Sequence, residues 1–449
     1  MKLQVAAALT GVSLALSAVL TGHAQQPAEP SADQVKPAAA PVQPVVLKAA
    51  HLFDGRSGRI SSPGVVVVQG DRIVAVGPSA ALPPNARVID LGEATLLPGF
   101  IDAHTHIASD HDDNWAQGFY DNMLRFPVEQ SFHAARNARL TLDAGFTTVR
   151  EVGAPDFVDV ALRNAINGGL VEGPRMLVAG HAIGSTGGHC DASPFPPERV
   201  KPAGTLEGVC NGAEQCRLAV REQMKFGADL IKICASGGVL SEADPVDVPQ
   251  LTPAELQAII GEAHTWGRKV AAHSHGDAAA RLAVEAGVDS IEHGSFLTAS
   301  TLQLMKQKGT YLVPTRMTQV WVVDKANTYP PKIGDKARAA GAAHTKMFKE
   351  ALRIGVPIAL GTDAAVYPHG MNAQEFGDMV DLGMSPATAL LTSSQGSAKL
   401  LGLAGETGTL EVGKLADVVA VPGDVLQNIR ATERPTLVMK QGKVIRGGE

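Results

Sequence analysis

Eight short apolar runs recur between residues 97 and 364, and each gives way at its C-terminal end to polar residues or glycine. They span residues 97–106, 146–153, 175–184, 230–238, 269–276, 290–294, 310–316 and 357–364. Stretches with helical periodicity, such as 128–145 and 278–287, lie between them. This alternation predicts a parallel sheet, and eight such units predict closure into a (β/α)8 TIM barrel over residues 98–402.

Shorter strand patterns flank the predicted barrel on both sides. Residues 45–97 alternate valine-rich runs with turn signals, and Gly70-Asp71 between two such runs is a hairpin turn candidate. Strand patterns return over residues 403–449 but are too few for a domain of their own. We therefore expect the two chain ends to form one small β-sandwich.

The N-terminus has the pattern of a targeting segment. Lys2 precedes an apolar stretch over residues 5–20, and Gly22 and Ala24 stand where a signal peptidase reads small residues. Residues 1–24 are thus expected to be a cleaved signal peptide, and the Pro/Ala-rich residues 25–44 a disordered linker. An uncleaved membrane anchor is the alternative, although the apolar stretch is short for a span. The mature protein is expected to be periplasmic or secreted, without membrane contact.

The amino-acid composition bears on the kind of binding partner and on the state of the cysteines. The chain has 449 residues, 45% hydrophobic and 19% charged, with a formal net charge of −6, which is an ordinary globular balance. The absence of a basic stripe argues against nucleic acid. An exported protein can form disulfides; a pairing among Cys190, Cys210 and Cys216 is a hypothesis, while Cys234 is expected to be a small apolar core residue.

Metal-competent side chains end several of the apolar runs. His104 and His106 are two positions apart on the first run, so they point to the same face of a strand. In a TIM barrel the C-terminal ends of the strands converge on one face. The predicted metal site comprises His104, His106, Lys232, His273, His293 and Asp363. Zinc suits these ligands; manganese, iron and cobalt stay open.

Two of these positions require a choice. His273 is preferred over His275 because it directly ends the run from Val270 to Ala272. A protonated Lys232 cannot ligate a cation, but burial near metal would deprotonate it. The neutral amine can then capture carbon dioxide as a carbamate (N6-carboxylysine) that bridges two metals. The alternative is an ordinary lysine with a solvated head, which the flanking Ile231 and Ile233 disfavour.

Substrate contacts are expected from the loops that follow the strands. His189 lies in the loop after the third run, and His275 lies two residues beyond His273. Arg316 ends the seventh run and could pair with a substrate carboxylate. Each of these residues also has a structural interpretation, as a loop histidine or as a member of an intramolecular salt bridge.

These motifs resemble the amidohydrolase superfamily. PGFIDAHTH (98–106), the lysine of the fourth run, the two later histidines and GTDA (361–364) are its motifs, and the resemblance covers residues 45–448. Within it, IKICASGG, HSHG and VDSIEHG look like the Xaa-Pro dipeptidase-like branch, which includes ochratoxinase-type carboxypeptidases. The resemblance implies two divalent metals bridged by carboxylated Lys232 and a hydroxide. It assigns His104, His106 and Asp363 to one metal and His273 and His293 to the other.

The expected reaction is hydrolysis of an amide next to a C-terminal amino acid, in an N-acyl amino acid, a dipeptide or an ochratoxin-like amide. Asp363 is expected to take a proton from the attacking hydroxide and deliver it to the leaving nitrogen. A cyclic-amide hydrolase or deaminase is the alternative, against which Lys232 argues because such enzymes often use one metal. A non-catalytic metal-binding assembly protein is a further alternative. A homo-oligomer is expected.

Overall fold

The computed structural model describes residues 43–191, 196, 198–242 and 244–448. The predicted signal peptide and nearly all of the predicted linker lie outside them. Within these ranges, no helix combines the length and the hydropathy needed to cross a bilayer.

Seven parallel strands form two sheets at the centre of the fold. The first sheet has the order β10-β9-β8, and the second β11-β12-β13-β14. Their bounds are β8 (Phe100–Thr105), β9 (Phe146–Glu151), β10 (Arg175–Val178), β11 (Ile231–Cys234), β12 (Val270–Ser274), β13 (Ser290–His293) and β14 (Tyr311–Val313). Nearly every residue of these strands is buried, as expected for a sheet covered on both faces.

Isolated parallel bridges join the two sheets into a ring. The bridging pairs are Ile183–Ile233, Leu312–Ile358 and Thr105–Ala364. The eighth run (357–364) therefore completes the ring by single bridges and by hydrogen bonds such as that from Ala103 N to Leu360 O (2.8 Å). The predicted (β/α)8 TIM barrel is confirmed.

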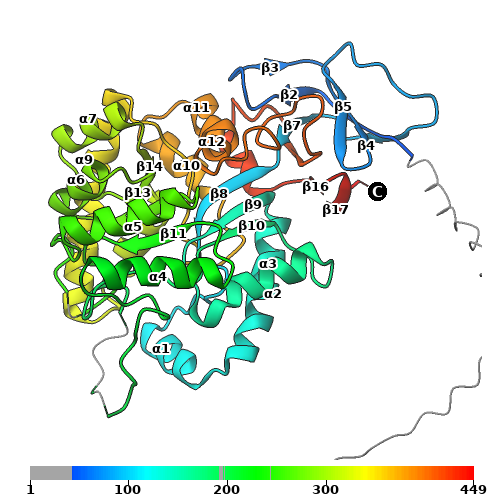
Figure 1. The fold of residues 1–449 in the computed structure, drawn as a ribbon. Coiled ribbons are helices and arrows are strands. Elements are labelled where there is room, and N and C mark those ends of the chain that lie inside the picture. The colour runs from blue at the N-terminus through cyan, green and yellow to red at the C-terminus, as the bar shows by residue number, and fades with distance from the viewer. Residues whose placement is uncertain (1–42, 192–195, 197, 243, 449) are drawn as a thin grey trace, which may run out of the picture. The chain divides into compact units, whose positions relative to one another are not determined.

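Helices follow the strands along the chain. In Figure 1, α4 to α7 lie outside β11 and β13. Buried residues of these helices, such as Ile259 and Leu302, share a core cluster with Ile233 and Ile291 of the strands. The helices are α1 (Trp115–Leu124), α2 (Pro127–Asp143), α3 (Val158–Asn167), α4 (Ala213–Lys225), α5 (Pro253–Thr265), α6 (Asp277–Glu285), α7 (Ala299–Lys308), α8 (Arg316–Asp324), α9 (Pro331–Ile354), α10 (Gln374–Asp381), α11 (Pro386–Leu391) and α12 (Ser397–Leu400), with shorter turns η1 (Pro155–Phe157), η2 (Thr392–Gly396) and η3 (Ile429–Glu433).

The two chain ends build a sandwich of two sheets, as predicted. One has the order β5-β4-β1-β6 and the other β17-β16-β15-β7-β2-β3. The strands are β1 (Val45–Ala49), β2 (His51–Phe53), β3 (Ile60–Ser61), β4 (Gly64–Gln69), β5 (Arg72–Val76), β6 (Arg87–Asp90), β7 (Ala94–Pro98), β15 (Val418–Pro422), β16 (Leu437–Lys440) and β17 (Lys443–Arg446). Leu47 and Val66 of one sheet pack with Val418 and Leu437 of the other. The β4–β5 hairpin turns at Gly70-Asp71 as predicted, and Gly70 has φ +62°.

The sandwich and the barrel share a core. Gly99, between β7 and β8, donates its N–H to Asp417 O (2.8 Å). Phe53 and Val419 of the sandwich belong to the same buried cluster as Phe146 and Phe376 of the barrel. The sandwich therefore packs directly on barrel residues rather than hanging on a linker.

Candidate metal centre

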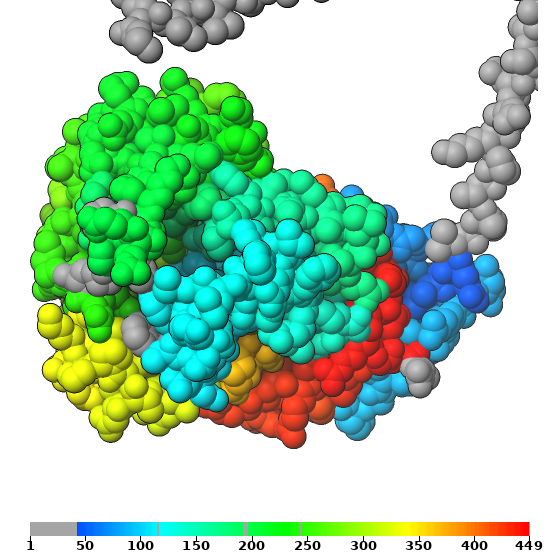
Figure 2. Space-filling model, turned by 90° about the horizontal axis from the view of Figure 1, so that it is seen from below, coloured from blue at the N-terminus to red at the C-terminus, as the bar shows by residue number. Residues whose placement is uncertain are grey.

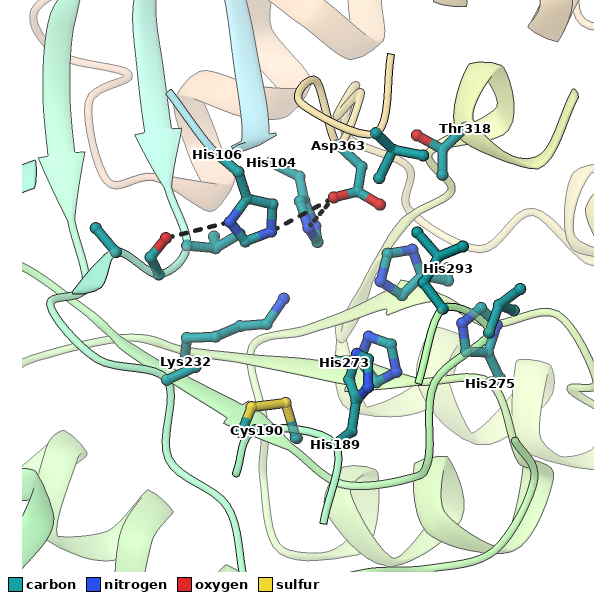
Figure 3. Close-up of a pocket in the computed structure, with 18 of the residues that line it drawn as sticks. His104, His106, His189, Cys190, Lys232, His273, His275, His293, Thr318 and Asp363 are labelled. Atoms are coloured by element: carbon teal, nitrogen blue, oxygen red, sulfur yellow. Dashed lines mark hydrogen bonds and ion pairs between the residues drawn. A yellow bond between two sulfur atoms is a disulfide. The ribbon is translucent and has the colours of Figure 1, made fainter. Parts of the chain in front are cut away.

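All the residues predicted to hold metal line one cavity of about 410 Å³. They come from different strands: His104 from β8 with His106 just after it, Lys232 from β11, His273 from β12, His293 from β13 and Asp363 from the eighth run. Figure 3 shows these side chains directed toward a common space. The face of the molecule seen in Figure 2 is hollowed between the cyan segment that includes α1 and the green middle of the chain.

The donor atoms form two clusters. Those of His104, His106 and Asp363 lie within 4.8 Å of one another, and the same holds for those of His273, His275 and His293. The Nε2 atoms of His104 and His106 are each 3.4 Å from Asp363 Oδ1. Two imidazoles and a carboxylate in one cluster, and imidazoles in the other, are ligand sets that zinc takes.

Each of these histidines uses one ring nitrogen for a neighbouring group and leaves the other for a ligand. The fixed nitrogens are His104 Nδ1 (2.7 Å from Glu292 Oε2), His106 Nδ1 (3.2 Å from Gly153 O), His273 Nε2 (3.1 Å from Gly237 O), His275 Nδ1 (2.9 Å from Ser295 Oγ) and His293 Nδ1 (2.8 Å from Thr315 Oγ1). Metal-ligating histidines are oriented in this way. Within the described residues, the buried His104 Nε2 has no hydrogen-bond partner. A metal ion would satisfy this atom, so the residues fit a metal centre.

His104 contacts a buried network of charged side chains. Glu292 is fully buried, and its other oxygen accepts a 2.8 Å hydrogen bond from the Arg150 guanidinium. Burial alone would raise the pKa of Glu292, but Arg150 and His104 outweigh it and lower that pKa to about 2. The sequence reasoning missed Glu292, although a glutamate inside the apolar run 290–294 was a signal.

Several residues at the candidate site have strained backbone conformations. His293 (φ 66°), Asp363 (φ 60°) and Thr315 (φ 49°) adopt the left-handed region that L-residues rarely occupy. Such conformations cost about 1–3 kcal/mol each and cluster at functional sites. Close packing adds a second constraint, because a Cβ on Gly361 would lie 2.8 Å from His104 Cβ. A glycine there lets the eighth run approach β8.

Burial controls the protonation of the site. It lowers the pKa of Lys232 to about 8, against the attraction of Glu292 and Asp363, and lowers that of His106 to about 4. Burial works to raise the pKa of Asp363, but His104, His106 and Lys232 outweigh it and lower that pKa. At neutral pH the site therefore offers a neutral imidazole at His106 and a carboxylate at Asp363, with a lysine that loses its proton more readily than usual.

Two of the three predicted substrate contacts lie in the cavity. His189 lines it with its ring centroid 4.3 Å from that of His273, and His275 stacks on His293 at 4.9 Å. His275 belongs to the same cluster as His273, so the geometry offers both as ligands where the sequence favoured His273.

Arg316 is placed elsewhere. It begins α8 and does not line the cavity. Its backbone N–H donates to Glu375 Oε1 (2.7 Å), and Glu375 and Asp378 are the charges that act on its guanidinium. This placement does not support the predicted contact with a substrate carboxylate, because the helix start turns the residue toward α10.

Other lining residues were not predicted to form the site. The polar ones are His181, Glu207, Thr318 and Gln319. The apolar wall consists of Val152, Ala154, Pro155, Ala182, Val239, Leu240, Val322 and Val366. All lie on segments that follow strands, which is the general signal that could have found them.

The cysteines pair as Cys190–Cys234 and Cys210–Cys216. The expectation that Cys234 is an unpaired core residue was therefore wrong. Cys234 is the last residue of β11, and the loop that carries Cys190 passes beside it. The path of that loop depends on tertiary packing, which residue spacing does not reveal.

A TIM barrel whose strand ends gather histidines, a lysine and an aspartate defines a metal-dependent barrel hydrolase. The model of the amidohydrolase family matches residues 95–445, and the chain belongs to that family. It is accordingly a hydrolase that acts on amide C–N bonds.

Known relatives match nearly the whole chain. It is 31% identical over 427 residues to the ochratoxinase of Aspergillus niger, covering 90% of this chain and 86% of that protein. The structure of that ochratoxinase superposes with a TM-score of 0.81 at 30% identity, covering 91% of this chain and 96% of that one. A Xaa-Pro dipeptidase with methionine bound in its active site gives a TM-score of 0.87 at 36% identity, covering 90% and 100%.

Proposed function

We propose that this enzyme hydrolyses the amide bond next to a C-terminal amino acid, in an N-acyl amino acid, a dipeptide or an ochratoxin-like amide. The observation that carries the proposal is the pair of three-donor clusters that share one cavity with Lys232. We assign two divalent ions, with zinc as the expected metal, to these clusters. The similarity to an ochratoxinase and a Xaa-Pro dipeptidase supports the substrate class.

Lys232 is proposed to join the two clusters as a carbamate. Its neutral amine attacks the carbon of carbon dioxide and releases one proton, which leaves an anionic carboxylate on Nζ. The burial that lowers the pKa of Lys232 to about 8 favours the neutral amine that this step needs. Figure 3 shows the Lys232 side chain extended toward the histidines.

Asp363 is proposed to move the proton. When bound, the two ions supply Lewis acidity, which lowers the pKa of a water and polarises the scissile carbonyl. The Asp363 carboxylate accepts a proton from the attacking water and delivers it to the leaving nitrogen. Amines leave poorly unless they are protonated, so an amidase needs this transfer. The neighbouring histidines and Lys232 keep this carboxylate charged at neutral pH.

The rest of the cavity suits an apolar substrate body with a polar head. Its wall is aliphatic, with Val152, Leu240 and Val322 among the lining residues, while His189 and His275 stand at the donor clusters. A free carboxylate next to the scissile amide would be attracted by the divalent ions that the two clusters would hold. Lys232 argues against the cyclic-amide alternative, because such enzymes often use one metal and need no carboxylated lysine.

The test is a panel of N-acyl amino acids and dipeptides, each paired with its C-terminal amide, assayed with and without a chelator. We expect close to two metal ions per chain, loss of turnover in the chelator and much lower kcat/KM for the amidated substrates, because an amide lacks the charge that the divalent ions would attract. Equal kcat/KM on acids and amides would move the substrate class to simple amides, lactams or esters.

We also propose that the protein is exported after cleavage behind Ala24. Two disulfides among the described residues support an oxidising compartment. N-terminal sequencing of the mature protein should begin at Gln25, whereas a retained Met1 would contradict cleavage.

A further inference from the structure

Contacts with neighbouring residues confine His189 at the edge of the candidate metal centre. Its backbone N–H donates to Gln250 Oε1 (2.8 Å), and its Nδ1 lies 3.1 Å from Ser241 Oγ. The ring lies against His273, with 4.3 Å between centroids. A Cβ on Gly238 would also overlap the ring. The position of this loop histidine is therefore closely defined.

A covalent bond fastens the same loop. Cys190, the next residue, is bonded to Cys234, two residues after Lys232 on β11. Cys234 is also the register partner of His273 in the β11–β12 ladder. The disulfide thus ties the segment that carries His189 to the strand that carries Lys232, beside the histidine that His189 contacts. Both of its cysteines line the cavity.

The second disulfide is placed differently. Cys210 and Cys216 are fully buried in the hydrophobic cluster around β11 and β12, where Cys216 belongs to α4. Neither lines the cavity. The chain therefore supplies a matched control, one disulfide in the site wall and one in the core.

We propose that the Cys190–Cys234 disulfide is a positioning element of the active site, which holds His189 against His273 so that its ring can meet the substrate. The inference rests on the proposed function, because the substrate is the one proposed above. Without the disulfide, the loop keeps hydrogen bonds such as that to Gln250 but no covalent tie to β11. Displacement of an active-site group by about 1 Å can cost on the order of 10²-fold in rate.

The kinetic test compares two double variants. In Cys190→Ala/Cys234→Ala we expect kcat/KM to fall on the order of 10–100-fold, mainly through a higher KM, with metal content unchanged. In Cys210→Ala/Cys216→Ala we expect lower thermal stability but kcat/KM within about twofold of wild type when both are assayed below their Tm. Equal kcat/KM in the two double variants would overturn the proposal.

A double-mutant cycle tests whether the disulfide acts through His189. His189→Ala alone should reproduce the defect, and adding it to Cys190→Ala/Cys234→Ala should change little, because interacting residues are not additive. Fully additive losses would overturn the proposal. Gly238→Ala serves if the cysteine variant does not fold: it displaces the ring with the disulfide intact, and an unchanged KM there would count against the inference.

Hydrogen exchange supplies a readout that needs no substrate. Amides of residues 185–191 should exchange faster in Cys190→Ala/Cys234→Ala than in wild type and in the core-disulfide variant. Unchanged exchange would contradict the positioning role. If wild type hydrolyses none of the amides, the proposed function fails while the exchange result stands. If wild type is active and Cys190→Ala/Cys234→Ala matches it, this inference alone fails.

Discussion

Glu292 orients His104 through one ring nitrogen, and each of the other clustered histidines is oriented by a hydrogen-bond partner in the same way. A carboxylate, two hydroxyls and two carbonyls hold one nitrogen of each clustered histidine, so the other nitrogen is free to bind. Lys232 and Asp363 differ from these imidazoles because each is proposed to have a function beyond ligation, as a bridging carbamate and as a proton carrier. The sharpest tests at the residue scale therefore concern these two side chains.

Lys232→Ala should remove the proposed carbamate bridge between the two clusters. Loss of groups that merely orient metal ligands costs about 10–100-fold, so loss of the bridge should cost about 10²-fold or more in kcat/KM. Metal analysis should show fewer ions per chain, and short carboxylic acids should restore part of the activity by occupying the vacated position. Lys269→Ala, at a half-exposed lysine paired with Asp289, is the control. Wild-type turnover in Lys232→Ala would exclude a bridging carbamate.

Asp363→Asn should separate proton transfer from metal binding. The amide keeps one ligand oxygen but cannot accept the proton, and loss of a general acid–base group typically costs about 10²–10⁴-fold in rate. We expect kcat to fall by that factor while metal content falls less. Steady-state kinetics and metal analysis on one preparation decide the point. A variant that cleaves amides as fast as wild type would reassign the proton transfer to another group.

At the scale of elements, the strand ends were predictable and the loop paths were not. His104, His293 and Asp363 end apolar runs, and strand geometry alone sends such residues to one face of a barrel. Arg316 also ends a run, but the chain enters α8 at that residue and its surroundings become Glu375 and Asp378. The Glu292–His104 contact and the Cys190–Cys234 pairing join residues far apart in sequence, so they exist only after the barrel closes.

Glu375, which accepts hydrogen bonds from the start of α8, should make the stability of the fold depend on pH. Glu375 is fully buried and accepts the N–H groups of Arg316 and Met317, both at 2.7 Å. Burial raises its pKa from 4.5 to about 8. Between these values the folded state holds a proton that the unfolded state has lost, so stability falls as pH rises through this window. Glu375→Gln removes this titration but sets an amide NH2 group against one of the two N–H donors. Its stability relative to wild type should therefore start lower and rise from pH 5 to pH 8, by up to a few kcal/mol.

Urea unfolding of both proteins at several pH values measures this difference. Glu255→Gln at the capping box of α5 is the control, because hydrogen bonds from Thr252 and Gly212 outweigh burial and lower the pKa of Glu255. Its stability contribution is complete above pH 5, so the deficit of that variant should stay constant from pH 5 to pH 8. A constant difference for Glu375→Gln as well would show that its carboxyl ionises normally.

At the scale of the whole molecule, the barrel and the sandwich stabilise each other through a shared hydrophobic core. Phe53 and Val419 of the sandwich pack in one cluster with Phe146 and Phe376 of the barrel. β15 from the C-terminal segment pairs along its length with β7, which leads directly into β8 and His104. Loss of the C-terminal strands would expose a core that the barrel also uses. The strand that carries His104 thus depends on both ends of the chain.

Removing metal should therefore weaken the entire fold. The candidate ligands come from β8, β11, β12, β13 and the eighth run, so the centre exists only when the ring is closed. Ions that bind only the folded state stabilise it by RT ln(1 + [L]/Kd), about 4 kcal/mol at a thousand times Kd. Scanning calorimetry should show Tm falling by several degrees in a chelator and recovering when zinc is returned. Lys232→Ala, which has already lost part of its metal, should respond less. An unchanged Tm in protein shown to be metal-free would mean that the ions bind the unfolded chain as tightly as the folded one.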